Sequence, residues 1–553
     1  MCNTVLVSGQ IEHTLRGSWT PAGAAAAGLS RHAVRWLANR IGLPDTVTPT
    51  VPVSLLNAPS SALLATAHTD LVDAVGEEFV LTSAAERLGR SGGMAYLDLL
   101  RRRTGEDVAV PDAVVLPGSP EQVQRVLDLC VRHDIAVVPF GGGTSVVGGV
   151  EALRGDKTAV IALDLCRLDR VVSLDPVSRI AVLQAGMRAV DAERLLAGHG
   201  FTLGHFPQSF ERATIGGFAA TRSSGQASSG YGRFDDMVQA VRVATPAGEW
   251  RLGAAPASAA GPDLRQLAIG SEGALGVITE VAVRVRPAPR HTRYEAVVID
   301  GWQAGVEAVR ALAQQRALAD VTRLSDVEET AAQLALSGHI PHRLVRALLR
   351  SKGIQHPCLL VLGWETETRR ELTQRRAAAL RALRGRRWLR LGQRPGKAWR
   401  ESRFAAPRQR DALMDFGVCV ETLETATNWS GLLELRSAVR TALIRSLQTG
   451  VQPPLIMCHL SHAYETGASL YFTVLAARDE KDPVGQWQKA KAAACEAITG
   501  RGTITHHHAV GTDHLPWLDR EIGQVGTAVL AAVKRAVDPT GILNPGKLIR
   551  PAQ

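Results

Sequence analysis

Residues 137–145 read Val-Val-Pro-Phe-Gly-Gly-Gly-Thr-Ser, an apolar segment that runs into three glycines and two hydroxyl side chains. Glycine adopts positive φ and has no Cβ, so successive backbone N–H groups can converge on an anion. Taken alone, the stretch is explained as well by an ordinary tight turn. Two more glycine-rich segments follow, Ala213–Gly225 and Gly270–Thr279. Three such loops in this order predict a dinucleotide site.

The kind of dinucleotide follows partly from missing motifs. There is no Gly-x-Gly-x-x-Gly between a strand and a helix, since Gly141 and Gly143 are followed by Val146, and there is no Walker-type loop. Pro139–Ser145, Thr214–Gly217, Tyr231-Gly232 and Glu272–Thr279 resemble the FAD-binding domain of the vanillyl-alcohol-oxidase or PCMH-type flavoproteins.

In that family the triple-glycine loop wraps the FAD pyrophosphate. Thr144 follows the glycines, and no histidine lies in or just after the loop, so the resemblance implies non-covalent FAD. The residues that it implies for FAD binding are Pro139, Phe140, Gly141, Gly142, Gly143, Thr144, Ser145, Gln208, Ser209, Thr214, Gly216, Gly217, Thr221, Arg222, Ser223, Ser224, Glu272, Gly273, Ala274, Leu275, Gly276, Val277 and Ile278.

Length and composition narrow the class of protein. A chain of 553 residues is too long for a single hydrophobic core, so more than one domain is expected. Its 45% hydrophobic and 21% charged residues are typical of a globular protein. The net charge of +10 comes from arginines that are spread along the chain, which does not favour nucleic-acid binding. Seven scattered cysteines without Cys-x-x-Cys, no secretory signal and no long apolar run predict a cytoplasmic protein, with peripheral membrane contact and a homodimer left open.

The order of expected elements predicts an α+β protein. Residues 1–106 are expected to form a partly helical N-terminal extension, and 107–288 the FAD-binding domain, which the resemblance makes a PCMH-type domain of two subdomains. In 289–505, strands near 294–299, 357–364, 416–422 and 469–475 alternate with helices. This pattern predicts an α/β substrate (cap) domain with an antiparallel sheet covered by helices. Residues 506–553 are a histidine-rich segment and a helix that return to the FAD site.

From about residue 80 onward the chain resembles one branch of these flavoproteins, the alkyldihydroxyacetonephosphate synthases of ether-lipid synthesis. The segments that carry this resemblance are Thr202–Ser209, Thr322–Asp326, Arg410-Asp411, Glu421–Thr425, Tyr464–Gly467 with Leu470–Phe472, and His506–Gly511. The catalytic residues that it implies are Tyr464, His506, His507, His508, Arg323 and His205, and Arg410 would bind the substrate phosphate.

The residue types suit these roles. Imidazoles move protons near neutrality, and a guanidinium fork matches a phosphate. Without the resemblance, the three histidines would equally suit a metal or a solvated loop. Tyr464 would be an ordinary core or surface tyrosine, and each arginine a surface ion-pair partner.

The first functional hypothesis is an FAD enzyme that exchanges the acyl chain of acyl-dihydroxyacetone phosphate for a fatty alcohol. The second is an FAD-linked oxidase or dehydrogenase of a 2-hydroxy acid or alcohol, favoured by Glu465-Thr466 where the synthases have Asp-Ala and by the Asn544–Lys547 terminus. A third, a flavin-less structural or lipid-binding protein, would require the glycine loops to be coincidental. No metal is expected, because His459-Leu-Ser-His462 does not continue into the His-x-Gly-Asp-Gly-Asn-x-His pattern of metal-dependent dehydrogenases.

Overall fold

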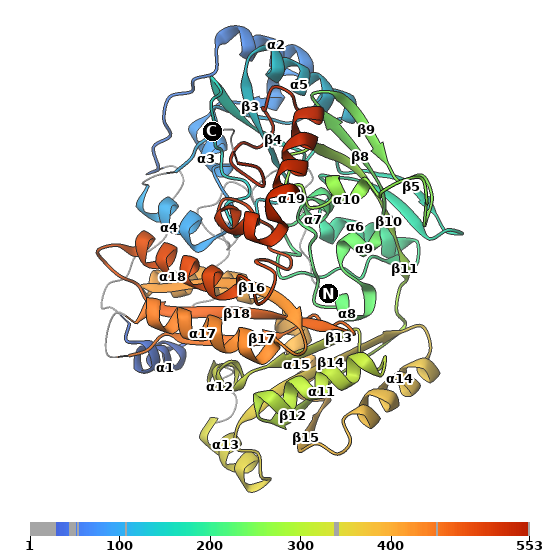
Figure 1. Ribbon diagram of the computed structural model, residues 1–553, viewed down its shortest axis with the longest axis vertical. Coiled ribbons are helices and arrows are strands. Elements are labelled where there is room, and N and C mark those ends of the chain that lie inside the picture. The colour runs from blue at the N-terminus through green and yellow to red at the C-terminus, as the bar shows by residue number, and fades with distance from the viewer. Residues whose placement is uncertain are drawn as a thin grey trace.

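The computed structural model describes residues 29–43, 51, 55–105, 108–336, 342–448 and 452–550 (Figure 1). The boundary that the sequence predicts between residues 106 and 107 lies outside the described residues. The two larger sheets of the FAD-binding region occupy the upper half of Figure 1, and the sheet of the cap region occupies the lower half.

The first sheet has the strand order β1-β2-β4-β3. Its members are β1 (Val80–Leu81), β2 (Ala113–Val115), β3 (Ile135–Phe140) and β4 (Ala159–Asp164), and β2 and β3 both run parallel to β4. Helix α5 (Pro120–Arg132) joins β2 to β3, and its N-terminus is capped by Ser119, whose Oγ accepts the Gln122 N–H at 3.2 Å. The triple-glycine loop leaves the end of β3.

The second sheet is antiparallel, in the order β5-β6-β10-β8-β9. It comprises β5 (Val171–Asp175), β6 (Ile180–Gln184), β8 (Val238–Thr245), β9 (Gly248–Leu252) and β10 (Val277–Arg284). The other two glycine segments belong to this part, because α7 (Ile215–Thr221) lies in the second one and β10 starts directly after Gly276 in the third.

The third sheet has seven antiparallel strands in the order β15-β12-β14-β13-β17-β18-β16. They are β12 (His291–Asp300), β13 (Val321–Ser325), β14 (Pro357–Thr366), β15 (Trp388–Gly392), β16 (Val418–Asn428), β17 (Leu455–Leu460) and β18 (Gly467–Ala477). Its helices include α1 (Arg31–Ile41), α11 (Trp302–Gln314), α12 (Val327–Leu336), α13 (His342–Ser351), α14 (Arg369–Ala382), α15 (Gln393–Ser402), α16 (Ala406–Asp415), α17 (Leu432–Leu447) and α18 (Pro483–Ile498). The predicted α+β fold with a helix-covered antiparallel cap sheet is confirmed.

Three strands of this sheet were not expected from the sequence, namely β13, β15 and β17. Each has only five or six residues, and every residue of β17 is buried. A strand that is buried along its whole length, such as β17, does not show the alternation of apolar and polar residues by which a strand is recognised, and β13 and β15 are too short for that pattern to stand out.

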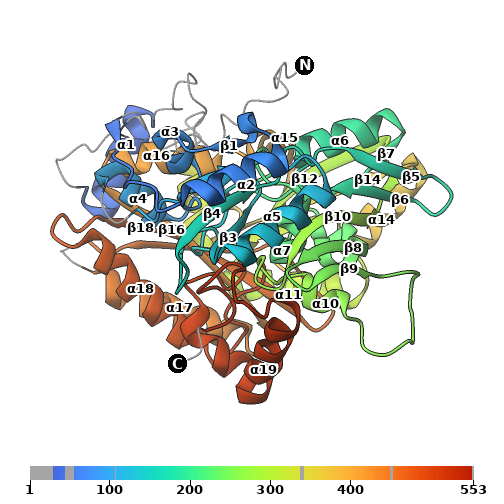
Figure 2. The ribbon, with the colours of Figure 1, turned by 90° about the horizontal axis from the view of Figure 1, so that it is seen from above.

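The described part of the predicted N-terminal extension is built into the sheets. Strand β1 pairs with β2. Helix α2 (Ala65–Val75) packs against α5, and Figure 2 shows the two side by side. Helix α4 (Tyr96–Thr104) contacts the cap region, where the Tyr96 N–H donates to the Glu421 carboxylate. Residues 65–104 therefore connect the FAD-binding region to the cap.

The C-terminal segment also reaches the first sheet. Helix α19 (Leu515–Val537) is interrupted at Gly523, and the chain then runs beside β3. The Val137 N–H donates to the Ile542 carbonyl and the Asn544 N–H to the Val137 carbonyl, both at 2.8 Å. Over the described ranges, no helix combines the length and the apolar character that crossing a bilayer requires.

Candidate active site

A cavity of about 850 Å³ lies between the glycine loops and the cap sheet. All of the residues predicted to contact FAD line it except Arg222, Ala274, Leu275 and Val277. The Arg222 guanidinium is instead paired with Asp235 at 3.3 Å, and the three apolar side chains are buried in the core. The three glycine loops thus surround one space.

The glycine loops approach each other too closely for side chains. A Cβ at Gly141 would lie 2.4 Å from Thr214 Oγ1, and one at Gly142 would lie 2.2 Å from the Arg212 carbonyl oxygen. Gly143 has a φ of 61°, which L-residues rarely adopt. The first loop is therefore an all-backbone cradle beside the second, which is what close approach to a pyrophosphate requires. The residues present fit FAD.

Glu272 ties the third glycine loop to the histidine-rich segment. Its carboxylate accepts the N–H groups of Val510 and Gly511, each at 2.8 Å. Burial raises the pKa of Glu272 to about 7, although these hydrogen bonds and the charge of Lys547 act in the opposite direction. The role of Glu272 in the structure is therefore to place the turn that follows the histidines, and it does so at the edge of the FAD cradle.

A second buried carboxylate, Glu424 on β16, holds the three histidines themselves. It accepts the N–H groups of His506, His507 and His508 at 2.7, 3.0 and 2.9 Å. Burial acts to raise the pKa of Glu424, but the neighbouring imidazoles in their protonated form and these N–H donors outweigh it and hold the pKa well below the usual value. The carboxylate is consequently ionised and fixes the backbone of the cluster.

The histidines occupy different depths. His507 and His508 line the cavity, whereas His506 lies behind them, with its Nδ1 2.9 Å from His507 Nδ1. Burial lowers the pKa of all three, that of His506 to about 3, so the imidazoles are neutral at neutral pH. A neutral imidazole has one donor and one acceptor nitrogen, which suits proton transfer.

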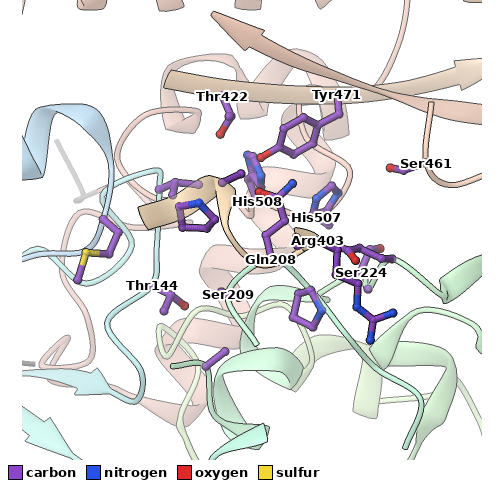
Figure 3. Close-up of a pocket in the computed structure, with 18 of the residues that line it drawn as sticks. Thr144, Gln208, Ser209, Ser224, Arg403, Thr422, Ser461, Tyr471, His507 and His508 are labelled. Carbon is purple, nitrogen blue, oxygen red and sulfur yellow. Dashed lines mark hydrogen bonds between the residues drawn. The ribbon is translucent and has the colours of Figure 1, made fainter. Parts of the chain in front are cut away.

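Two tyrosines, Tyr464 and Tyr471, lie next to the histidine cluster, and Tyr464 is the one that the sequence predicts to be catalytic. Tyr464 is 37% exposed and is not among the described residues that line the cavity; its hydroxyl lies 2.6 Å from His506 Nε2. Tyr471 on β18 does line the cavity, with its ring stacked 4.7 Å from that of His459. Figure 3 shows Tyr471, His507 and His508 on one side of the cavity, across from Thr144 and Ser209.

Tyr471 was missed although a signal was present in the sequence. Side chains two apart on a strand point to the same face, so Tyr471, Thr473 and Leu475 share one face of β18, and all of them line the cavity. Burial raises the pKa of Tyr471 to about 12, opposed by a hydrogen bond with Thr422 and by the charge of Arg410. Its hydroxyl is therefore protonated at neutral pH.

The predicted arginines both line the cavity and are anchored by carboxylates. Arg410 Nη2 donates to Glu421 Oε1 at 2.8 Å, and Nη1 donates to the Met94 carbonyl at 2.6 Å. Arg323 Nη2 donates to Glu329 Oε1 at 2.8 Å. Each guanidinium is thus oriented before any ligand arrives, and neither is the solvent-exposed ion-pair residue that its type alone would suggest.

His205 lies outside the cavity wall. Its ring is buried against Phe218 and Phe234, with centroids 4.6 and 5.2 Å away, and its Nε2 lies 3.0 Å from Ser223 Oγ. Burial lowers its pKa to about 3. Its observed contact toward the cavity runs through Ser223, which lines it.

One group of histidines has the spacing of a metal site. Ring nitrogens of His462, His506 and His507 lie within 4.8 Å of one another. The Nδ1 atoms of His506 and His507 already contact each other at 2.9 Å. The expectation that the enzyme needs no metal stays a prediction, which chelation of the holoenzyme tests.

The rest of the cavity is apolar and runs under the cap sheet and its helices. Its wall there includes Leu29, Trp36, Leu37, Val298, Leu349, Leu359, Leu391, Trp399, Leu413, Val420, Met457 and Leu475. These side chains come from α1, α13, α15 and α16, from the strands, and from adjoining loops. The polar end at the glycine loops and histidines thus opens into a space suited to a hydrocarbon chain.

Comparisons with known proteins agree with this arrangement. The family described as "FAD binding domain" matches residues 111–253, and "FAD linked oxidases, C-terminal domain" matches residues 288–548. The alkyldihydroxyacetonephosphate synthase of Dictyostelium discoideum is 31% identical over 473 residues, which cover 84% of this chain and 77% of that protein. The chain belongs to the alkyldihydroxyacetonephosphate synthase family. It is an FAD-dependent enzyme of this family.

The chain is also similar to a solved synthase structure and to a flavoprotein with another activity. A solved alkyldihydroxyacetonephosphate synthase structure superposes with a TM-score of 0.79 at 26% identity, covering 93% of this chain and 92% of that one. The mitochondrial D-lactate dehydrogenase [cytochrome] of Arabidopsis thaliana is 29% identical over 471 residues, covering 80% of this chain and 74% of that protein. The family fold therefore hosts more than one activity.

We expect the FAD to be released when the purified protein is denatured with acid. The loop that ends in Thr144 and Ser145 offers no histidine to the flavin, and the cradle consists of backbone and hydroxyl groups. The measurement is the flavin absorbance of the supernatant after precipitation. Flavin that stays with the pellet would show a covalent link.

Proposed function

We propose that the protein exchanges the acyl chain of acyl-dihydroxyacetone phosphate for a fatty alcohol, as an alkyldihydroxyacetonephosphate synthase. The observation that carries the proposal is a single cavity that joins an FAD cradle, the oriented guanidinium of Arg410 and a long apolar extension. A substrate with a phosphate at one end and a chain at the other matches this layout. Such lipids reside in membranes, so peripheral contact with a bilayer is part of the proposal.

Each part of the wall has a task in this reaction. Arg410 binds the phosphate, since a guanidinium offers paired donors to its oxygens. Tyr471 and His507 hold or take the proton at C1 of the substrate, and the apolar wall binds the chains and excludes water. FAD, when bound, supplies the electrophile that the exchange needs.

The alternative is oxidation of a 2-hydroxy acid or alcohol, which the likeness to a D-lactate dehydrogenase favours. A small hydroxy acid would use only the polar end of the cavity and would leave the apolar extension without a purpose. Localisation in the cytoplasm and a homodimer also stay proposals.

Anaerobic mixing with candidate substrates separates the two functions. We expect acyl-dihydroxyacetone phosphate to bleach the flavin absorbance and a fatty alcohol to restore it, with alkyl product and free fatty acid formed in equal amounts. Bleaching by lactate or glycolate, with no response to the acyl lipid, would instead establish the dehydrogenase.

Replacing Arg410 with lysine tests the phosphate site. We expect Arg410→Lys to weaken binding of a phosphorylated substrate roughly ten- to a hundredfold, because an ammonium cannot reproduce the fork and about 1.5–3 kcal/mol is lost with one charge-assisted hydrogen bond. Binding is measured from the substrate dependence of flavin bleaching, with an unphosphorylated analogue in parallel.

The matched control is Arg408→Lys on the same helix. The Arg408 side chain is 41% exposed and pairs with Glu211 rather than lining the cavity. We expect this change to have little effect on either ligand. Equal losses for both ligands in Arg410→Lys would assign Arg410 to the structure of the cap instead.

A further inference from the structure

Three side chains connect the cavity to the surface in one hydrogen-bonded row. His507 lies on the cavity wall, its Nδ1 is 2.9 Å from His506 Nδ1, and His506 Nε2 is 2.6 Å from the Tyr464 hydroxyl. The row passes from the cavity, through a buried imidazole, to a tyrosine that is 37% exposed. We propose that His507, His506 and Tyr464 form the path by which protons pass between the reacting substrate and solvent.

The exchange reaction needs such a path, so the inference rests on the proposed function. C1 of the substrate loses a proton early, and the product carries two hydrogens there again, so a proton has to return. The released fatty acid ionises at neutral pH, so the proton of the alcohol has to leave the site. Both protons therefore need carriers that lead from the cavity wall to water.

The transfer balances along the row. A proton taken up at His507 Nε2 releases the Nδ1 proton to His506 Nδ1, and His506 passes its Nε2 proton to the tyrosine oxygen. Tyr464 gives up its own hydroxyl proton to water, so one proton leaves and all three side chains are neutral afterward. The return of a proton to C1 runs the same steps backward and restores the starting tautomers.

Neighbouring groups hold the three side chains of this path in position. Glu424 fixes the backbone of both histidines through the N–H bonds at 2.7 and 3.0 Å. The Trp429 indole N–H donates to the carbonyl oxygens of Tyr464 and Glu465 at 3.2 and 3.1 Å, which fixes the outer end. Burial raises the pKa of Tyr464 to about 12, with Arg233 acting against it, so the hydroxyl is present to pass a proton on.

The role of Tyr464 therefore differs from that of Tyr471. Tyr471 lies on the cavity wall, where it can touch substrate, whereas Tyr464 acts through His506 from outside the cavity. Removing its hydroxyl should leave FAD and substrate binding intact and trap the C1 proton inside, where it returns to the carbon from which it came.

The experiment is turnover of the holoenzyme in D₂O, with deuterium at C1 of the product measured by mass spectrometry. Wild-type enzyme should incorporate deuterium, and Tyr464→Phe should reduce the incorporated fraction to about a tenth or less, because the proton carrier is lost. Imidazole added to the buffer should restore incorporation, because it can carry the proton from His506. The neighbouring Glu465→Gln change, at an exposed residue, should behave as wild type.

Wild-type incorporation in a Tyr464→Phe enzyme that retains FAD would overturn the path. If Tyr464→Phe loses FAD, the test uses Tyr464→His instead, because histidine keeps a ring with a donor and an acceptor. Reduced deuterium incorporation in a Tyr464→His enzyme that retains FAD would contradict the relay. Wild-type enzyme without synthase turnover would refute the proposed function instead. In that case the same variants are compared during the oxidation reaction that bleaches the flavin, and the release of protons is followed with a pH indicator. Proton release by Tyr464→Phe at the wild-type rate would overturn the path.

Discussion

A Gly142→Val variant is expected to purify without its yellow colour. The Cβ alone would lie 2.2 Å from the Arg212 carbonyl oxygen and 2.9 Å from Ala213 Cα, so the first glycine loop has to move away from the second. Overpacking of this kind costs about 1–3 kcal/mol. If the whole cost falls on the FAD-bound form, the affinity for FAD drops by roughly five- to 150-fold. The measurement is flavin absorbance per protein after gel filtration.

Gly198→Ala at the end of α6 (Ala189–Gly198) is the control. A Cβ there would meet nothing within 4 Å, and the residue does not have positive φ, so FAD content should be normal. Circular dichroism distinguishes loss of FAD from loss of the fold. Stoichiometric FAD in Gly142→Val would mean that the two loops are not packed against each other when FAD is bound.

The parts of the fold that could be predicted are those that local sequence determines. Helix α5 has a serine cap, a proline in its first turn and apolar residues at helical spacing, and the structure begins it within one residue of the expected start. The glycine loops were also predictable, since consecutive glycines are needed wherever backbone has to approach a ligand or another loop closely.

The parts that could not be predicted depend on contacts between distant segments. In the sequence, Glu424 is an acidic residue within a strand, and only the folded chain brings the N–H groups of residues 506–508 to its carboxylate. Glu272 similarly binds the backbone of residues 510–511. Nothing local identifies the partner of such a carboxylate, and the same holds for the pairing of Arg410 with Glu421, although Arg410 itself was predictable from the sequence.

The choice between Tyr464 and Tyr471 depends on where β18 begins and on which of its faces meets the cavity. A motif places both tyrosines within eight residues, and alternation along the strand puts Tyr471 on one face with Thr473 and Leu475, but only the pairing of β18 with β16 and β17 fixes that face at the cavity. Tyr464 precedes β18 and points its hydroxyl to His506, whereas Tyr471 lies within the strand beside His459.

This difference leads to the second large effect. Tyr471→Phe should retain FAD and the fold yet lose about 10²–10⁴-fold in turnover, because only a hydroxyl that can hold or move a proton is removed from the cavity wall. The ring keeps its stacking on His459, so the substrate concentration that gives half-maximal flavin bleaching should change little, although bleaching becomes slower. Imidazole should not rescue this variant, because the missing group has to touch substrate on the cavity wall, whereas it should rescue Tyr464→Phe, whose missing hydroxyl lies outside the cavity. The opposite result is that Tyr471→Phe turns over at the wild-type rate while Tyr464→Phe is inactive with or without imidazole. The proton chemistry would then belong to Tyr464, and the substrate would have to reach beyond the cavity to meet it.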